Sequence, residues 1–173
     1  MTPQFEIIAC PPERREALYR LRAAVWLDEG ASPAAFDAGQ WTDARDATRR
    51  HWIALHQDEV IAGASLSIHD GLRQVEEAEA YLAYDLPEDG PVAVPARVVV
   101  HRDWRGRGVV QRLLDIQEEA ARDSRAVLAV RQASRMMRPL LARRGWRYHG
   151  PGPQDPRFPR EQFAVMSWLP GSR

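Results

Sequence analysis

The sequence contains no lysine and no asparagine, and its only cysteine is Cys10. A single cysteine excludes an internal disulfide framework. The chain also lacks an apolar stretch long enough to span a bilayer, and no apolar run follows a basic N-terminal start. These absences predict a soluble, cytoplasmic protein.

Charge of one sign is not in excess either, because 24 basic residues balance 24 acidic ones. The chain therefore has no global field that would favour nucleic acid or an anionic membrane. Every basic residue is arginine, which binds phosphate bidentately but is a poor general base. A length of 173 residues suits one domain, 1–173, with a substantial core.

One stretch, Ala96–Leu114, combines three kinds of pattern. Ala96–Val100 is a short β-branched run typical of a buried strand, and a loop of alternating Arg and Gly follows it. Apolar or small residues then recur at helical spacing, at Val109, Val110, Leu113, Leu114, Gln117, Ala120 and Ala121. A strand, a glycine loop and a helix start present free N–H groups and the positive end of a helix dipole, which suit a phosphate.

The remaining elements are expected on both sides of this stretch. Strands are expected at Phe5–Cys10, His51–His56, Val60–His69, Ala126–Arg131, Trp146–His149 and Gln162–Trp168. Helices are expected at Pro12–Asp28, Pro33–Ala38 and Met136–Arg144, and Gln74–Tyr84 is either a helix or a surface loop. Pro87–Pro91 should break the chain before the central strand, and the central helix should end near Asp123. The crossover rule makes the two strands around the central helix parallel neighbours.

This order of elements resembles the GCN5-related N-acetyltransferase (GNAT) superfamily over nearly the whole chain. The sharpest likeness is Arg105–Gly106–Arg107–Gly108–Val109–Val110, which follows the family's acyl-CoA loop, Arg/Gln-x-x-Gly-x-Gly/Ala, except at Val110. The resemblance implies an α/β fold with a central mixed sheet of six to seven strands, flanked by about four helices. It also implies acetyl-CoA or another acyl-CoA as co-substrate and no metal.

The same resemblance implies which residues bind the donor. The backbone of Val98 and Val100 would contact the pantetheine arm, and Ser134 takes the place of a family asparagine that also serves it. The pyrophosphate would lie against Arg105, Gly106, Arg107, Gly108, Val109, Val110 and Gln111. Arg102, Arg107 and Arg112 are candidates for the 3′-phosphate, with a simply solvated arginine as the alternative for each, and Trp104 is expected to pack under the loop.

The sequence indicates the catalytic residues less clearly than the donor-binding residues. The resemblance implies that a backbone N–H near Val99 polarises the thioester carbonyl. Glu77, Glu79 and His101 are candidate general bases, with Glu76 and His69 as further choices, although the glutamates also fit a solvated face. Leu141 occupies the position of the tyrosine that reprotonates the CoA thiolate in many family members, and leucine cannot act as an acid.

Residues of the N-terminal half and of the last loop are candidates for acceptor selection: Trp26, Glu29, Trp41, Asp43, Ser65, Ser67, Phe158, Arg160 and Glu161. The segments Tyr19–Trp26, Asp43–Asp46 and His51–Ala54 are similar to the opening of acyl-homoserine-lactone synthases, which share the fold. The proline-rich stretch Pro151–Pro159 either covers the acceptor site or only connects two strands.

Three functional hypotheses remain. The first is an N-acyltransferase that transfers acetyl to a primary amine of a small molecule or amino acid in a ternary complex. The second is a catalytically impaired acyl-CoA-binding relative with a regulatory or sensing role, which Leu141 favours. The third, an RNA-binding module on the arginine-rich segments 102–112 and 135–147, is disfavoured by the neutral charge. The expected partners are an acyl-CoA and a small amine, without nucleic acid or membrane, and a homodimer is left open.

Overall fold

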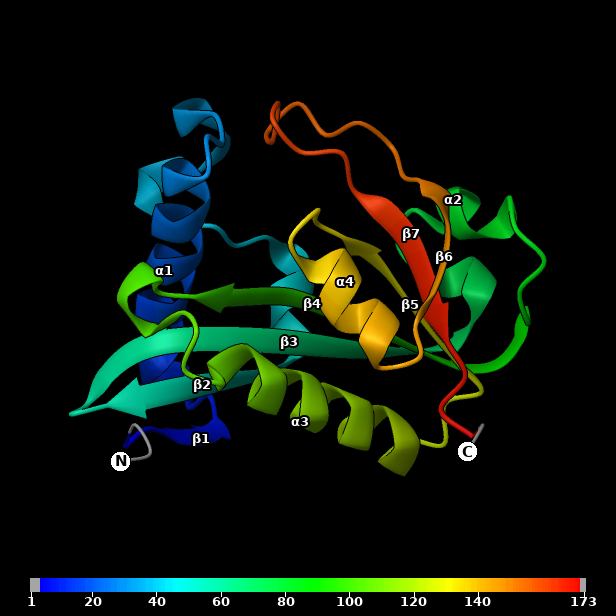
Figure 1. Cartoon of the computed structure of the whole chain (residues 1–173), viewed down its shortest axis with the longest axis horizontal. Coiled ribbons are helices and arrows are strands. Elements are labelled where there is room, and N and C mark those ends of the chain that lie inside the picture. The colour runs from blue at the N-terminus through cyan, green and yellow to red at the C-terminus, as the bar shows by residue number, and fades with distance from the viewer. Residues whose placement is uncertain (1–3, 172–173) are drawn as a thin grey trace. The chain divides into compact units, whose positions relative to one another are not determined.

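The computed structural model describes residues 4–171, which contain seven strands and four α-helices (Figure 1). The strands are β1 (Glu6–Ala9), β2 (Arg50–His56), β3 (Glu59–Gly71), β4 (Asp89–Val100), β5 (Leu128–Ala133), β6 (Arg147–Pro151) and β7 (Ala164–Trp168). The α-helices are α1 (Arg15–Asp28), α2 (Ala78–Leu82), α3 (Val109–Asp123) and α4 (Met137–Arg143). Six short 3₁₀ segments are η1 (Pro12–Arg14), η2 (Pro33–Ala35), η3 (Asp37–Gly39), η4 (Ala44–Ala47), η5 (Leu72–Gln74) and η6 (Arg102–Trp104).

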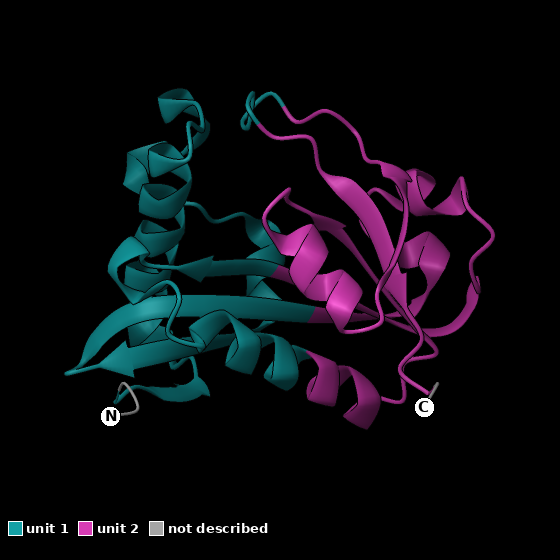
Figure 2. Cartoon of the chain, viewed as in Figure 1, with its two compact units in different colours: residues 1–66, 97–117, 156–160 teal, residues 67–96, 118–155, 161–173 magenta. Residues whose placement is uncertain are grey.

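The strands form one mixed sheet with the order β1-β2-β3-β4-β5-β7-β6. All described pairings are antiparallel except that of β4 with β5, which is parallel with Val92 opposite Leu128 and Ala93 opposite Ala129. The mixed sheet and the parallel pair confirm the predicted fold class. By its pattern of contacts the chain divides into two compact units, and each of β3, β4 and α3 contributes to both (Figure 2).

The first unit contains 1–66, 97–117 and 156–160. Its core includes Cys10, Leu18 and Ile53, with Leu18 and Ile53 fully buried. Helix α1 approaches β3 so closely that a Cβ at Gly63 would overlap with the Leu18 side chain. A side chain at that point of the strand would displace the fully buried Leu18 side chain, so glycine permits the close approach of helix and strand.

The second unit contains 67–96, 118–155 and 161–173. Its core joins α2 to three neighbouring strands through Tyr81, Val92, Leu128, Val130 and Val165, together with Leu72 and Val75. Tyr81 is 3% exposed, and burial raises the pKa of its phenol far above the usual value. Burial likewise lowers the pKa of the Arg131 guanidinium on β5 to about 10.

Two sequence-based expectations about elements were wrong, and a third was met only in part. Pro87–Pro91 does not precede the central strand, because β4 begins at Asp89 and runs through Pro91 and Pro95. Gln74–Tyr84, for which a helix and a surface loop were both open, contains only the short helix α2, and its first residue ends η5. Pro33–Ala38 contains two 3₁₀ segments, since Ala38 adopts a left-handed conformation with φ 50°.

Candidate functional site

The segment between β4 and α3, within the first unit, has the geometry of an anion-binding loop. Gly106 and Gly108 have φ values of +72° and +80°, and a Cβ built at either glycine would meet no atom within 4 Å. Helix α3 begins immediately afterwards at Val109 and has no acidic residue in its first turn. The N–H groups of that first turn lack intrahelical partners, and no carboxylate of the turn neutralises the helix dipole. The loop therefore fits a phosphate or pyrophosphate group.

Two arginines near this loop lie over aromatic rings. The guanidinium carbon of Arg107 is 5.0 Å from the centre of the Trp104 ring, and that of Arg112 is 5.0 Å from the centre of the Phe5 ring. Trp104 itself packs against His56, with ring centres 4.6 Å apart, and meets Phe5 edge-on at 6.3 Å. These contacts agree with the expectation that Trp104 packs beneath the loop, and they leave two guanidiniums beside it.

Arg105, the first residue of the loop motif, is engaged at both ends of its guanidinium group. Its Nη1 donates to Oε1 of Glu29 at 2.9 Å, and its Nε donates to the carbonyl oxygen of Val100 at 3.4 Å. Glu29 is the C-cap residue of α1. The ion pair thus connects the end of α1 to the start of the loop.

The predicted donor and catalytic residues on β4 lie next to this loop in the chain. Val99 is buried, while Val98 and Val100 are half-buried. The amide of His101 donates to the carbonyl of Ile61 on β3 at 2.8 Å. The His101 ring accepts a hydrogen bond from the backbone N–H of Asp103 at 3.3 Å and caps η6, so this histidine has a local structural role.

Four residues that the resemblance relates to catalysis or to the pantetheine arm, Glu77, Glu79, Ser134 and Leu141, belong to the second unit. Oε2 of Glu77 accepts a hydrogen bond from the Gln132 side-chain amide at 2.6 Å, and Glu79 is exposed in the first turn of α2. The carbonyl of Ser134 accepts hydrogen bonds from the amides of Met137 and Arg138 and so starts α4. Leu141 is fully buried and therefore belongs to the core.

A buried ionic network in the first unit was not predicted. Arg22, Asp46 and His51 are each at most 5% exposed. Oδ1 of Asp46 accepts from Nη1 of Arg22 at 3.0 Å, and Oδ2 of Asp46 accepts from Nη1 of Arg97 at 3.0 Å. Burial works against ionisation of Asp46, but the charges of Arg22 and Arg97 outweigh it and lower the pKa of this carboxyl group.

The environment of the network also affects the protonation of two further side chains, His51 and Arg49. Nε2 of His51 lies 2.8 Å from the Asp46 carbonyl and Nδ1 lies 3.1 Å from Nη2 of Arg22, an arrangement that suits a neutral ring. Burial lowers the pKa of His51. Burial and the nearby charge of Arg97 together lower the pKa of Arg49 to about 10. The sequence signal for the network was the acidic connector Asp43–Asp46, but nothing local indicated which arginines it binds.

An aromatic cluster in the first unit unites several of the residues proposed for acceptor selection. Phe158 lies 4.7 Å from Trp26 and 5.3 Å from Trp41 between ring centres, and Phe36 lies 5.9 Å from Trp41. The amide of Ser32 donates to the carbonyl of Arg157 at 2.9 Å. The proline-rich stretch is therefore docked at its tip through Phe158. Trp41 lies in this cluster, although the polar sequence around it suggested a more exposed position.

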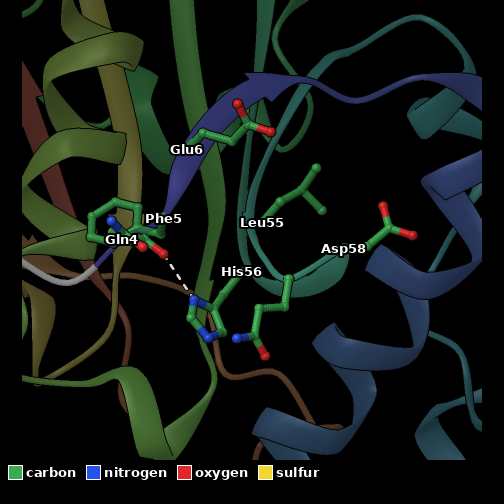
Figure 3. Close-up of a pocket in the computed structure, with 7 residues that line it drawn as sticks. Gln4, Phe5, Glu6, Leu55, His56 and Asp58 are labelled. Carbon is green, nitrogen blue, oxygen red and sulfur yellow. Dashed lines mark hydrogen bonds between the residues drawn. The ribbon is translucent and has the colours of Figure 1, made fainter.

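A cavity of about 440 Å³ lies at the sheet edge formed by β1. Its walls are Gln4, Phe5, Glu6, Leu55, His56, Gln57 and Asp58 (Figure 3). Nδ1 of His56 and the carbonyl oxygen of Gln4 are 2.8 Å apart, which fixes one side of the cavity (Figure 3). None of these residues belongs to the predicted donor site.

Two features are absent from residues 4–171. No group of three or more His, Cys, Asp or Glu side chains in this range is arranged to hold a metal ion. Over the same range, no helix combines the length and the apolar character needed to cross a membrane.

The strand, glycine loop and helix start on a mixed sheet fit an α/β fold with a candidate phosphate loop. A profile of the acetyltransferase (GNAT) family matches residues 15–146, so the chain belongs to this family. A search of curated proteins found no match. Members of the GNAT family use acyl-CoA as donor.

Solved structures with the same fold are numerous. A putative N-acetyltransferase from Lactobacillus plantarum matches with a TM-score of 0.66 and 22% identity, covering 95% of this chain and 97% of the other. The AHL synthase LasI matches with a TM-score of 0.73 and 11% identity, covering 97% and 91%. A predicted acetyltransferase with acetyl-CoA from Clostridium acetobutylicum matches with a TM-score of 0.62 and 17% identity, covering 82% and 89%. At these identities the likeness establishes the fold alone.

Proposed function

We propose that this protein is an acyl-CoA-dependent N-acyltransferase that transfers acetyl from acetyl-CoA to a primary amine of a small molecule or amino acid. The observation that carries the proposal is the loop Arg105–Gly108, with two left-handed glycines directly before the N-terminus of α3. Membership of the acetyltransferase family supports the same conclusion. The acetyl-CoA complex of the C. acetobutylicum protein, which has the same fold, favours acetyl-CoA as donor.

In the proposed complex the loop holds the donor. The amides of Gly106 to Gln111 bind the pyrophosphate, Arg107 and Arg112 contribute positive charge, and the β4 backbone at Val98 and Val100 aligns the pantetheine arm. Ser134 supplies a further hydroxyl to that arm. The donor is thereby held by main-chain groups, which explains why the valine side chains can remain part of the core.

The proposed reaction is direct attack in a ternary complex. The neutral amine attacks the thioester carbon, a backbone N–H near Val99 stabilises the oxyanion, the C–N bond forms, and the C–S bond breaks to release CoA thiolate. Oxyanion donors of this kind typically contribute about 10²–10³ in rate. The attacking amine must first lose a proton, and Glu77, Glu79 and His101 are the proposed bases. The thiolate takes a proton from solvent or from the amine, because Leu141 offers none.

Calorimetry and a thiol-release assay test this proposal. Acetyl-CoA should bind the wild-type protein, and Gly108→Trp should abolish binding because a large side chain would fill the loop. Gly171→Trp, in the C-terminal tail, is the matched control. A wild-type protein that binds neither acetyl-CoA nor CoA would refute the proposal.

A second candidate function is a catalytically impaired acyl-CoA-binding protein with a regulatory or sensing role. The fully buried Leu141 in place of a tyrosine acid favours it. Acetyl-CoA binding without thiol release, across amine acceptors and acyl chain lengths, would support this candidate over the first. Release of CoA with any amine would exclude it.

A further inference from the structure

Arg97 interrupts β4 with a left-handed backbone conformation. Its φ is +55°, in a strand that otherwise runs from Asp89 to Val100. Residues other than glycine rarely adopt this conformation, because Cβ approaches the backbone too closely. Such a conformation persists only where the surrounding structure holds it, and it is enriched at functional sites.

Two carboxylates form ion pairs with the Arg97 side chain. Oδ2 of Asp43 lies 2.5 Å from Nη2 of Arg97, and Oδ2 of Asp46 lies 3.0 Å from its Nη1. The guanidinium also lies 4.8 Å from the centre of the Trp41 ring, and the side chain is only 8% exposed. Because both terminal nitrogens are bound and one face is covered, the side chain has a single position.

The two carboxylates that bind Arg97 are themselves held in place by hydrogen bonds. The side chain of Asp43 accepts from the backbone N–H of Arg45, and Oδ2 of Asp46 accepts from the backbone N–H of Asp43 at 3.1 Å, so η4 carries a reciprocal capping box. The Thr42 hydroxyl donates to the same Asp46 oxygen at 2.9 Å, and Arg22 binds the other oxygen. Asp46 is 1% exposed, so it is too occupied and too buried to serve as a base or to bind an acceptor.

We propose that Asp43 and Asp46 are positioning residues. By binding the Arg97 side chain they hold the backbone of Arg97 in its left-handed conformation. This conformation sets the direction of the Val98–Val100 backbone against which the thioester is bound. The inference rests on the proposed function, since it assigns the device that aligns the oxyanion-stabilising N–H near Val99. A regular strand at residue 97 would turn the next peptide plane and move that N–H away from the thioester oxygen.

The direct test compares Arg97→Ala with Arg97→Gly. Both variants remove the same side chain and leave the same two carboxylates without it, but only glycine adopts a left-handed φ without strain. The probe is acetyl-CoA labelled with ¹³C at the carbonyl, whose infrared stretching frequency reports polarisation of the bound thioester. Arg97→Gly should retain the wild-type frequency and thiol-release rate, whereas Arg97→Ala should lose the frequency shift and about tenfold in rate. Equal values for the two variants would overturn the proposal.

A second pair keeps the test decisive if both Arg97 variants fold poorly. Asp43→Asn weakens the interaction of Arg97 with the more exposed of its two carboxylate partners, since the Asp43 side chain is 29% exposed. It should reduce the frequency shift, and the double variant Asp43→Asn with Arg97→Gly should restore it. The matched control is Asp58→Asn, which removes a 77% exposed partner of Arg14 and should change nothing. Lack of any change in Asp43→Asn would contradict the role of Asp43.

The affinity for CoA without an acyl group distinguishes a failure of the proposed function from a failure of the positioning role. It should be the same in the wild type and in every Arg97 and Asp43 variant, because the pyrophosphate loop is untouched. If the wild type binds no acetyl-CoA, the proposed function fails. If it binds acetyl-CoA but Arg97→Ala and Arg97→Gly polarise the carbonyl equally, only the positioning role fails.

Discussion

Glu29 and Arg105 form an ion pair with 2.9 Å between Oε1 and Nη1. The two side chains are 38% and 37% exposed, so solvent reaches both. Arg105 opens the candidate phosphate loop, and Glu29 caps the C-terminus of α1. A pyrophosphate bound at the loop would therefore compete with Glu29 for the same guanidinium.

Glu29→Gln should strengthen the binding of acetyl-CoA by up to about fivefold, because exposed ion pairs are worth about 0.2–1 kcal/mol. Isothermal titration calorimetry at low salt gives the two dissociation constants. Glu16→Gln is the matched control, since Glu16 forms an exposed ion pair with Arg20 on the same helix at 2.8 Å. Weaker binding in Glu29→Gln would mean that the glutamate supports the loop instead of competing for it.

Gly106→Ala should weaken acetyl-CoA binding by about tenfold, because a left-handed φ costs a residue with Cβ about 1–2 kcal/mol. Space is not the obstacle, since a Cβ at Gly106 meets no atom within 4 Å. The loop can relieve the strain only by changing its backbone conformation, which would misalign its amides. The dissociation constant checks the effect, with Gly39→Ala as control because Gly39 is also left-handed with open space but lies in η3. Unchanged affinity in Gly106→Ala would exclude a role for this loop conformation.

Stability should fall as the pH is lowered from 7 to 5, because His51 is buried with a lowered pKa. An unfolded histidine takes up a proton near pH 6.5, whereas the folded ring resists it until a lower pH. The unfolded state therefore binds more protons in this range, and the contribution of His51 is complete above about pH 6.5 and is lost below it. The slope that one proton contributes cannot exceed about 1.4 kcal/mol per pH unit.

Urea unfolding at closely spaced pH values measures this slope. The His51→Gln variant should be less stable at pH 7, and its stability should change less between pH 7 and 5 than that of the wild type. His56→Gln serves as control, because this ring accepts or donates only one hydrogen bond, to the Gln4 carbonyl, among the contacts described for it. Identical slopes for the wild type and His51→Gln would contradict the assignment.

Leu141→Tyr should not create a catalytic acid. Leu141 is fully buried, so a larger side chain with a hydroxyl would overpack the core and destabilise the protein by about 1–3 kcal/mol. We expect a lower melting temperature and no gain in thiol release. Leu140→Tyr, at the half-buried neighbouring position, should be better tolerated. A rate increase in Leu141→Tyr would show that this position does reach the leaving thiol.

Elements with strong local signals were predictable from the sequence. Helix α3 begins at Val109 and ends at Asp123 as expected, and six of the seven residues expected on its inner face are buried, with Val110 half-buried. The strands expected at His51–His56 and Val60–His69 are also present, as the antiparallel pair β2 and β3. Proline was the misleading signal at Pro91 and Pro95, since an extended conformation suits proline and the strand continues through both.

The buried network could not be predicted, for two physical reasons. Its partners are distant in sequence, with Arg22 and Asp46 separated by 24 positions and Asp43 and Arg97 by 54. The left-handed conformation of Arg97 also has no local marker, because arginine has no preference for positive φ. The conformation of the candidate loop could be predicted, because glycines mark its left-handed positions. The residues that hold β4 were missed because their geometry depends on tertiary contacts.

The segment between β6 and β7 has ends that are hydrogen-bonded to each other. The amide of Gly152 donates to the carbonyl of Phe163 at 2.8 Å, and Nε2 of Gln162 donates to the carbonyl of Gly152 at 3.1 Å. The residues between them can therefore change in number or type without altering the pairing of the two strands, since the entropy of closing a loop depends only weakly on its length. This segment carries Phe158, which packs against Trp26 and Trp41, so a change at its tip would alter the aromatic cluster while the pairing of β6 with β7 stays the same.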